Sequence, residues 1–146
     1  FEALGGQLNA FMAEVTALKC HPGVQHTGDN LRRLLTDSAH LARHKGQRLQ
    51  DALSLRSMPQ VHGACRDQFD HAARQVEKEL RSATDNPLVV PVEDGYQVVS
   101  QANPHGASVA MACDLLAIAA CEWSSISERR AYRLVTPQAK VVSSLA

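Results

Sequence analysis

Hydrophobic positions at three- and four-residue spacing run along most of this chain and predict helices. The clearest stripe begins at Pro59 and continues for about 25 residues, or roughly 37 Å of helix. Proline suits a helix start because its missing N–H would be unpaired there anyway. The opposite face is charged, and we expect it to meet solvent or another subunit. The apolar stripe consists of Val61, Cys65, Phe69, Ala73, Val76, Leu80 and Ala83.

A second long helix is predicted over residues 107–134. Its first half is apolar nearly all round, which predicts burial on every side. Its second half narrows to an apolar face of Trp123, Ile126 and Ala131. The most apolar run, residues 107–121, is too short to span a bilayer and contains Asp114. We therefore interpret this segment as a core helix.

The first third of the chain is less regular. Its apolar spacing predicts a helix over residues 2–19, which Cys20-His21-Pro22-Gly23 ends. Thr27 or Asp29 is a suitable cap for a following helix with Leu31, Leu34 and Leu35 on one face. Residues 37–49 are basic and poorly patterned, and we expect a mobile loop there.

Between the long helices, residues 88–92 and 96–99 are rich in valine and flank Glu93-Asp94-Gly95. Asp-Gly between β-branched runs predicts a hairpin, the only strands we expect. The fold class is therefore all-α, with long antiparallel helices and one small β-hairpin. A helix of such length protrudes from a small globule unless other helices run beside it, so we expect a bundle, and an oligomeric one.

Composition narrows the function classes. Lys+Arg and Asp+Glu balance at 15 each, so neither a nucleic acid nor a membrane surface is indicated as a partner. The four cysteines contain no Cys-x-x-Cys pair, which favours buried thiols in a reducing cytoplasm. His40 and His44 would lie one turn apart on a helix. Zinc would need a third ligand at a recognisable spacing, so we interpret them as surface histidines and expect no metal.

Candidate chemistry gathers in residues 50–63, which read Gln-Asp-Ala-Leu-Ser-Leu-Arg-Ser-Met-Pro-Gln-Val-His-Gly. The neutral amide of Gln50, the cation of Arg56 and the rigid helix start at Pro59 lie close together in sequence. An arginine fork pairs with a carboxylate bidentately, so this stretch can hold a small carboxylate-bearing ligand. The alternative is that Arg56 caps a loop carbonyl, which is the commoner role of a lone arginine near a helix start.

The same stretch resembles the Gln-Asp-x-Tyr-Ser-Leu-Arg-x-x-Pro-Gln-Val-x-Gly signature of the aromatic amino acid ammonia-lyases, most of all their histidine ammonia-lyase members. Asn103-Pro104-His105-Gly106 resembles the Asn-Phe-His-Gly loop of that family. Further matching stretches occur in the family's order and extend the resemblance over nearly the whole chain: Cys20 to Gly23, Ser82 to Val89 and Ser127-Glu128-Arg129-Arg130.

The resemblance implies an enzyme that eliminates ammonia from an aromatic amino acid, giving an α,β-unsaturated acid such as urocanate from histidine. It implies a fumarase/aspartase-like helical bundle in a homotetramer, whose active sites are each built from several subunits. It also implies a 4-methylideneimidazol-5-one prosthetic group, made by cyclising an internal Ala-Ser-Gly, and a tyrosine base. Arg56 would hold the substrate carboxylate, Gln50 would lie near the prosthetic group, and Asn103 and His105 would contact the substrate.

This chain departs from the family pattern at chemical positions. Leu53 stands where the family has its tyrosine, and leucine has no proton to exchange. Pro104 replaces the loop phenylalanine, and Arg81 stands where an asparagine often precedes serine. No Ala-Ser-Gly occurs in the 146 residues, which begin at Phe1 without methionine.

We therefore interpret residues 1–146 as one helical segment of the central bundle, without the N-terminal prosthetic-group domain and the C-terminal part, and not catalytic alone. Three functions stay open for the parent protein. It is a lyase, a divergent or inactive homologue such as an aminomutase or an oligomerisation segment, or a non-catalytic helical interaction module.

Overall fold

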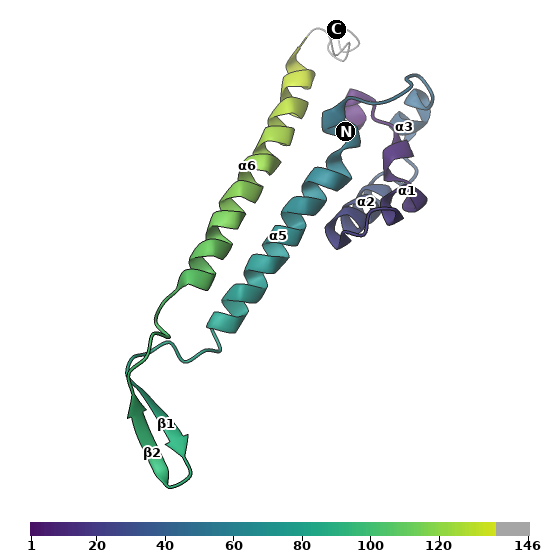
Figure 1. Cartoon of the computed structure of the whole chain (residues 1–146). Coiled ribbons are helices and arrows are strands. Elements are labelled where there is room, and N and C mark those ends of the chain that lie inside the picture. The colour runs from purple at the N-terminus through teal and green to yellow at the C-terminus, as the bar shows by residue number, and fades with distance from the viewer. Residues whose placement is uncertain (137–146) are drawn as a thin grey trace.

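The computed structural model describes residues 1–136. Two long helices, α5 (Met58–Glu79) and α6 (Ala107–Val135), run antiparallel and side by side (Figure 1). A hairpin of β1 (Leu88–Val92) and β2 (Gly95–Val99) extends beyond one end of this pair, and the short N-terminal helices gather on α5 toward the other end. The predicted fold class, long antiparallel helices with one small hairpin, is confirmed. The last ten residues of the predicted 1–146 segment lie outside the described residues.

The N-terminal third differs most from the prediction. The single helix expected over residues 2–19 is wrong, because the chain forms η1 (Glu2–Leu4), η2 (Leu8–Phe11) and α1 (Ala13–Ala17) instead. Gly5 ends the first of these with a left-handed φ of 61°, a conformation that stops a helix and suits glycine.

The next two helices also begin elsewhere than predicted. Helix α2 (Pro22–Leu34) starts at its proline, so Thr27 and Asp29 lie inside the helix and do not cap it. The expected loop over residues 37–49 contains α3 (Ala39–His44), whose N-cap Ser38 accepts a hydrogen bond from the Leu41 N–H. A short helix α4 (Leu53–Arg56) then leads into α5.

The long elements follow the sequence pattern closely. Helix α5 carries Pro59 in its first turn, as predicted, and ends at Glu79, before the expected Ala83. The strands pair antiparallel from Leu88 opposite Val99 to Val92 opposite Gly95. Gly95 takes a φ of 128°, which a side chain would disfavour at this tight turn.

Helix α2 meets α5 through two facing glycines. A Cβ atom added to Gly23 would lie 2.1 Å from the Gly63 carbonyl oxygen, and one added to Gly63 would lie 2.5 Å from the Val24 nitrogen. The Gly23 N–H donates to Asp67 Oδ1 at 2.8 Å, which ties the first turn of α2 to α5. The Cys20–Gly23 and Gln50–Gly63 motifs therefore meet in space at this backbone contact.

We expect Gly23→Ala to lower the free energy of unfolding by about 3 kcal/mol, because the new methyl group meets backbone that cannot rotate away. Urea unfolding of the protein measures this loss. Gly106→Ala is the matched control, since a Cβ at Gly106 meets nothing within 4 Å. Equal losses in the two variants would contradict the close α2–α5 contact.

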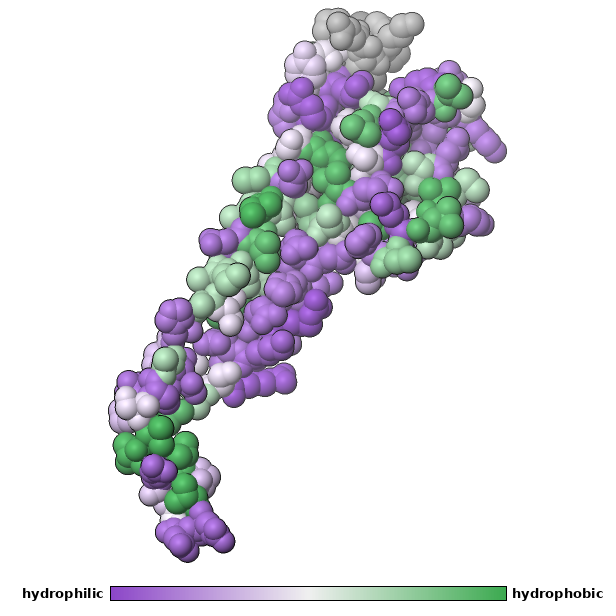
Figure 2. Space-filling model, viewed as in Figure 1, coloured by the Kyte–Doolittle hydropathy of each residue, from purple (hydrophilic) through white to green (hydrophobic). Residues whose placement is uncertain are grey.

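Apolar faces of α5 and α6 stay exposed in this chain, and Figure 2 shows apolar patches along α6. The prediction that the first half of α6 is buried on every side is wrong here: Met111 is 69% and Ile118 61% exposed. On α5, Phe69 is 63% exposed. The two helices bury one seam against each other through small side chains such as Ala72, Ala112 and Ala119. The apolar pattern therefore exceeds what one copy of the chain covers.

Two smaller expectations can be compared with the structure. The helix carrying the 107–121 run ends at Val135, as the predicted range of 107–134 implies, and by length and composition alone α6 could cross a membrane, a test that core helices of soluble proteins also pass. Of the four free thiols, only Cys65 is buried, and its Sγ donates to the Ala119 carbonyl at 3.2 Å. The expectation of buried thiols is wrong for Cys20, Cys113 and Cys121, which are exposed.

Candidate functional site

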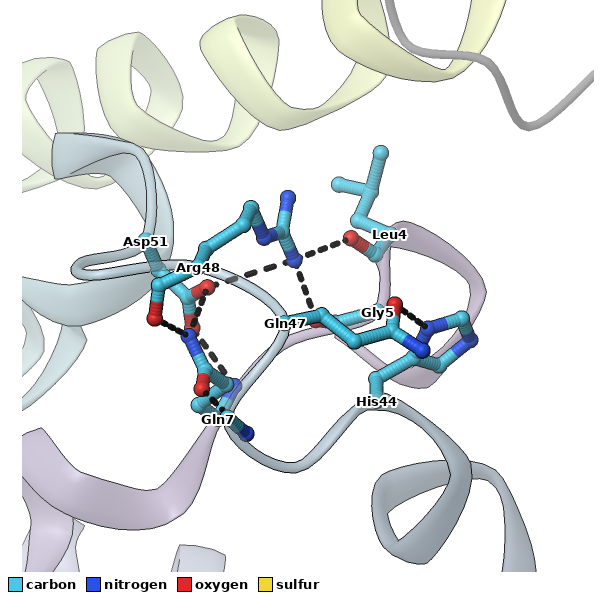
Figure 3. A network of polar contacts seen from close by, with 8 residues as sticks. Leu4, Gly5, Gln7, His44, Gln47, Arg48 and Asp51 are labelled. Atoms are coloured by element: carbon cyan, nitrogen blue, oxygen red, sulfur yellow. Dashed lines mark hydrogen bonds and ion pairs between the residues drawn. The ribbon is translucent and has the colours of Figure 1, made fainter.

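The loop before α4 is anchored by a buried carboxylate. Asp51 accepts hydrogen bonds from the Gln7 backbone N–H at 2.5 Å and from Gln7 Nε2 at 3.3 Å (Figure 3). Arg48 lies 3.2 Å from the same carboxylate, and its guanidinium also donates to the carbonyls of Leu4 and Gly5. Because only 2% of the Asp51 side chain is exposed, this pairing fixes the loop that carries Gln50 against the N-terminal segment.

Helix α4 carries Leu53 and Arg56, the two positions on which the expected chemistry depends. Leu53, at its start, is 64% exposed, whereas Leu55 in the same turn is buried. Arg56 is partly buried in the last position, and its Nε is buried without a hydrogen-bond partner among residues 1–136. Gln50 is exposed, outside the helix. A buried donor left without a partner is costly. Because the Arg56 side chain as a whole stays partly exposed, the rest of its guanidinium can pair with an acceptor from elsewhere.

Arg130 ties α6 to α4 and α5. Its guanidinium donates to the Ser54 carbonyl at 3.3 Å, to His62 Nε2 at 3.3 Å and to Ser127 Oγ at 3.0 Å. Burial lowers the pKa of Arg130 from its ordinary value, yet an arginine stays charged in proteins. The Ser127–Arg130 motif therefore supports α4.

His62 is a titratable side chain beside α4 that bonds Arg130. Burial, followed by the nearby charges of Arg130 and Arg66, lowers its pKa to about 4. Its ring lies edge-on to Trp123, with the ring centroids 5.4 Å apart. Arg130 can only donate, so the Nε2 atom of His62 accepts and the imidazole is neutral at physiological pH.

This pKa predicts a loss of stability in mild acid. The folded pKa lies below the unfolded value of 6.5, so the unfolded state binds the extra proton between these values and stability falls as pH drops from 6.5 toward 4. We expect a loss on the order of 2 kcal/mol across that window, less than the full shift implies because the ring keeps some solvent contact. Urea unfolding at several pH values measures it.

The matched variants are His62→Gln and His26→Gln. The first removes the titrating ring and should flatten the pH dependence between 6.5 and 4, whereas the second removes an exposed histidine and should leave it as in the wild type. A His62→Gln protein with an unchanged slope would show that another group titrates.

A groove of about 310 Å³ lies beside α4. Leu53, Ser54 and Ser57 line one side of it, and Ser54 Oγ is buried with no hydrogen-bond partner in the described chain. Helix α6 contributes charges of both signs to the same lining, Arg129 and Arg133 together with Glu122. The position of the family tyrosine therefore faces a largely apolar groove that charged side chains also line.

Asn103 and His105 lie at the opposite end of α5 from Arg56. Asn103 Nδ2 donates to the carbonyl of Ala83, just beyond the end of α5, at 3.1 Å. Arg56 lies just before the start of this 22-residue helix, whose length is roughly 33 Å. The structure therefore groups Gln50 with Arg56 and Asn103 with His105, and does not bring the two groups together within one chain.

The turn after α5 holds the Asn103 loop in place. Gln101 donates from its backbone N–H to Asn86 Oδ1 at 2.9 Å and from Nε2 to the Asp85 carbonyl at 2.6 Å. Asn103, Pro104 and His105 are exposed on the resulting loop. Asp85 and Asn86 of the Ser82–Val89 stretch thus position this exposed loop.

No metal centre forms within residues 1–136, where no group of three or more His, Cys, Asp or Glu side chains is placed to hold an ion. His40 is exposed. His44 Nδ1, at the end of α3, lies 3.0 Å from Gln47 Oε1 in the loop that follows.

The sequence model of the family described as aromatic amino acid lyase matches residues 1–146. The chain belongs to the aromatic amino acid lyase family. It is 45% identical over 136 residues to histidine ammonia-lyase 2 of Fusobacterium nucleatum, an alignment that covers 93% of this chain and 26% of the relative. The chain thus spans about a quarter of the length of the curated relatives it matches.

Solved structures carry the same fold. Histidine ammonia-lyase from Trypanosoma cruzi aligns with a TM-score of 0.79 and 36% identity, covering 94% of this chain and 24% of that one. Tyrosine aminomutase from Streptomyces globisporus aligns with a TM-score of 0.83 and 32% identity, covering 96% of this chain and 30% of that one. The backbone arrangement of this lyase-family segment is therefore shared by a lyase and an aminomutase.

Proposed function

We propose that the protein carrying this chain eliminates ammonia from an aromatic L-amino acid, with histidine the first candidate and urocanate its product. The proposal rests on Arg56, which has an unpartnered donor among residues 1–136 and lies in a turn held in place, in a chain that belongs to this family. Its Nε is buried and unpartnered within the described residues, and it sits in a turn fixed on both sides. A planar fork held in this way suits the carboxylate of an amino acid. The histidine ammonia-lyase relative supports histidine as the substrate.

The complete site would combine residues from several copies of the chain. Arg56 would bind the substrate carboxylate, and Gln50 would supply a neutral amide beside the reacting centre. Asn103 and His105 would reach the substrate from another subunit, because α5 separates them from Arg56 within one copy. The exposed apolar faces of α5 and α6 support a homo-oligomer, a tetramer by family resemblance. We propose a cytoplasmic location.

The family's prosthetic group, 4-methylideneimidazol-5-one, would have to come from residues outside this chain. No Ala-Ser-Gly occurs in the 146 residues, so nothing here can be cyclised to form it. When present, this group supplies an electrophile. The roles proposed for the present residues are to bind and orient the substrate, and the 146-residue piece alone is expected to show no turnover. No metal is proposed.

Leu53 and Pro104 favour a second candidate function. Both replace family residues at chemical positions, and Leu53 can neither accept nor donate a proton. A parent protein with these residues would be a divergent homologue that moves the amino group within the substrate. The name of one structural neighbour, tyrosine aminomutase, describes that reaction. It could also be an inactive member that serves as an oligomerisation segment.

The test is an assay of the full-length protein with histidine, phenylalanine and tyrosine. We expect slow formation of the unsaturated acid, detected by its ultraviolet absorbance, with histidine the best of the three. A β-amino acid product, detected by chromatography, would support the aminomutase instead. If no product of either kind forms from any of the three, the proposed elimination is wrong.

A further inference from the structure

The turn that carries Arg56 has little structure of its own. Helix α4 contains only four residues, Leu53–Arg56, far too few to be stable without tertiary contacts. The Leu53 carbonyl accepts from the Ser57 N–H of the same turn at 2.9 Å, whereas the Ser54 carbonyl bonds a partner from outside the turn. The partner of the Ser54 carbonyl therefore helps to fix where the Arg56 side chain starts.

One end of the turn is held by Asp51. This buried carboxylate is bonded to Gln7 and paired with Arg48, and both partners come from outside α4. The other side is held from α6, where Arg130 donates to the carbonyl of Ser54, two residues before Arg56. The two ties come from opposite directions along the sequence, because Gln7 precedes Asp51 by 44 residues and Arg130 follows Ser54 by 76.

Arg130 bonds only neutral acceptors within the described chain. His62 Nε2, the Ser54 carbonyl and Ser127 Oγ accept from its guanidinium, and no carboxylate of residues 1–136 forms an ion pair with it. Its planar fork joins α4, α5 and α6 at a single point. An arginine with this geometry fixes direction as well as distance, which a lysine on a flexible stem does less well.

We propose that Arg130 is a positioning residue for the substrate carboxylate: bonded to the Ser54 carbonyl and to His62, it holds α4 so that Arg56 presents its fork in one orientation. The inference rests on the proposed role of Arg56 in binding that carboxylate. His62 is the second member of the device, because its neutral Nε2 fixes the Arg130 fork from the α5 side.

The test compares two ligands that differ by the carboxylate, L-histidine and histamine, by titration calorimetry on the full-length protein. The readout is the preference for histidine over histamine, measured as the ratio of the two dissociation constants. Arg56→Gln should abolish most of this preference. Arg130→Gln should reduce it roughly ten- to hundredfold, since small misplacements of a binding group cost that much, while histamine affinity stays as in the wild type.

Matched variants separate positioning from general stability. Arg33→Gln removes an exposed arginine of α2 and should leave the preference unchanged. Arg130→Lys keeps the charge without the fork and should give an intermediate preference. His62→Gln keeps an acceptor and should retain the preference, whereas His62→Phe should reduce it. If Arg130→Gln does not fold, Arg130→Lys and the two His62 variants still test the proposal. Hydrogen exchange of the residue 52–57 amides, which should speed up in Arg130→Gln, follows the turn directly.

Each failure has a distinct meaning. If Arg56→Gln removes the histidine preference and Arg130→Gln leaves it intact, the positioning role is overturned and the proposed function stands. Faster exchange in Arg130→Gln with unchanged preference would reduce Arg130 to a stabilising residue, which also overturns the proposal. If Arg56→Gln itself leaves the preference unchanged, the carboxylate role of Arg56 fails, and the positioning role fails with it.

Discussion

Leu53→Tyr in the full-length protein is expected to raise the rate of ammonia elimination roughly 10²- to 10⁴-fold, the usual contribution of a positioned proton-transfer group. The structure can accept the larger side chain. Leu53 is 64% exposed and borders a groove, so the ring requires no repacking of the core. The fold should therefore be nearly as stable as the wild type.

A tyrosine at this position would have to lose its proton to act as the base. Arg129 and Arg133 line the groove together with Glu122, and Arg129 is paired with Glu128, so charges of both signs would lie near the phenol. We expect the rate of Leu53→Tyr to rise with pH to a plateau, as the phenol ionises. The wild type should lack that rise, because leucine does not titrate.

Leu53→Phe is the matched control, because it adds the ring without the hydroxyl. We expect its elimination rate to stay at the wild-type level, measured by absorbance of the unsaturated acid. If Leu53→Tyr stays as slow as Leu53→Phe, the missing base is not the only defect, and Pro104 in the loop at the other end of α5 becomes the next position to change. The pair Leu53→Tyr with Pro104→Phe then tests whether the two departures act together.

Local sequence patterns predicted α5 and the hairpin because residues within each element determine where it starts or turns. Pro59 sets the start of α5 through its own φ and its missing N–H. Asp94-Gly95 sets the hairpin because glycine reaches the positive φ that the turn needs. The break in the predicted helix over residues 2–19 also had a local signal, the Gly5-Gly6 pair, which apolar spacing alone does not register.

The supports of the candidate site could not be predicted in this way. Asp51 meets Gln7, and Ser54 meets Arg130, across long stretches of sequence whose spacing carries no signal. The alternative role for Arg56 was to cap a loop carbonyl. In the structure Arg48 and Arg130 bond carbonyls in this way, whereas Arg56 keeps its Nε unpartnered in the described chain. Only the family resemblance distinguished Arg56 from its neighbours.

The exposed apolar faces illustrate a second limit of sequence patterns. Periodicity showed which side of α5 and which part of α6 is apolar, and the structure confirms a shared seam between the two helices at Cys65 and Ala119. It did not show what covers the remaining faces, which expose Phe69, Met111 and Ile118. A pattern reports the chemistry of a surface, whereas burial depends on a partner that one chain does not contain.

Arg56→Gln in the full-length protein is expected to lower kcat/KM for elimination by about 10²- to 10³-fold, since two charge-assisted hydrogen bonds to a carboxylate contribute on the order of 3–5 kcal/mol together. The loss should fall mainly on KM if the carboxylate is bound equally in the ground and transition states. The fold should survive, because the Arg56 Nε has no hydrogen bond to lose within residues 1–136.

Arg56→Lys separates charge from geometry at the same position. A lysine keeps the attraction to the carboxylate but lacks the planar fork, so we expect it to recover part of the lost kcat/KM and to stay well below the wild type. Steady-state kinetics with histidine measures all three proteins. Full recovery by lysine would show that Arg56 acts only as a positive charge. Wild-type kinetics in Arg56→Gln would mean that the substrate carboxylate is bound by another residue, and the buried, unpartnered Nε would then need a different explanation.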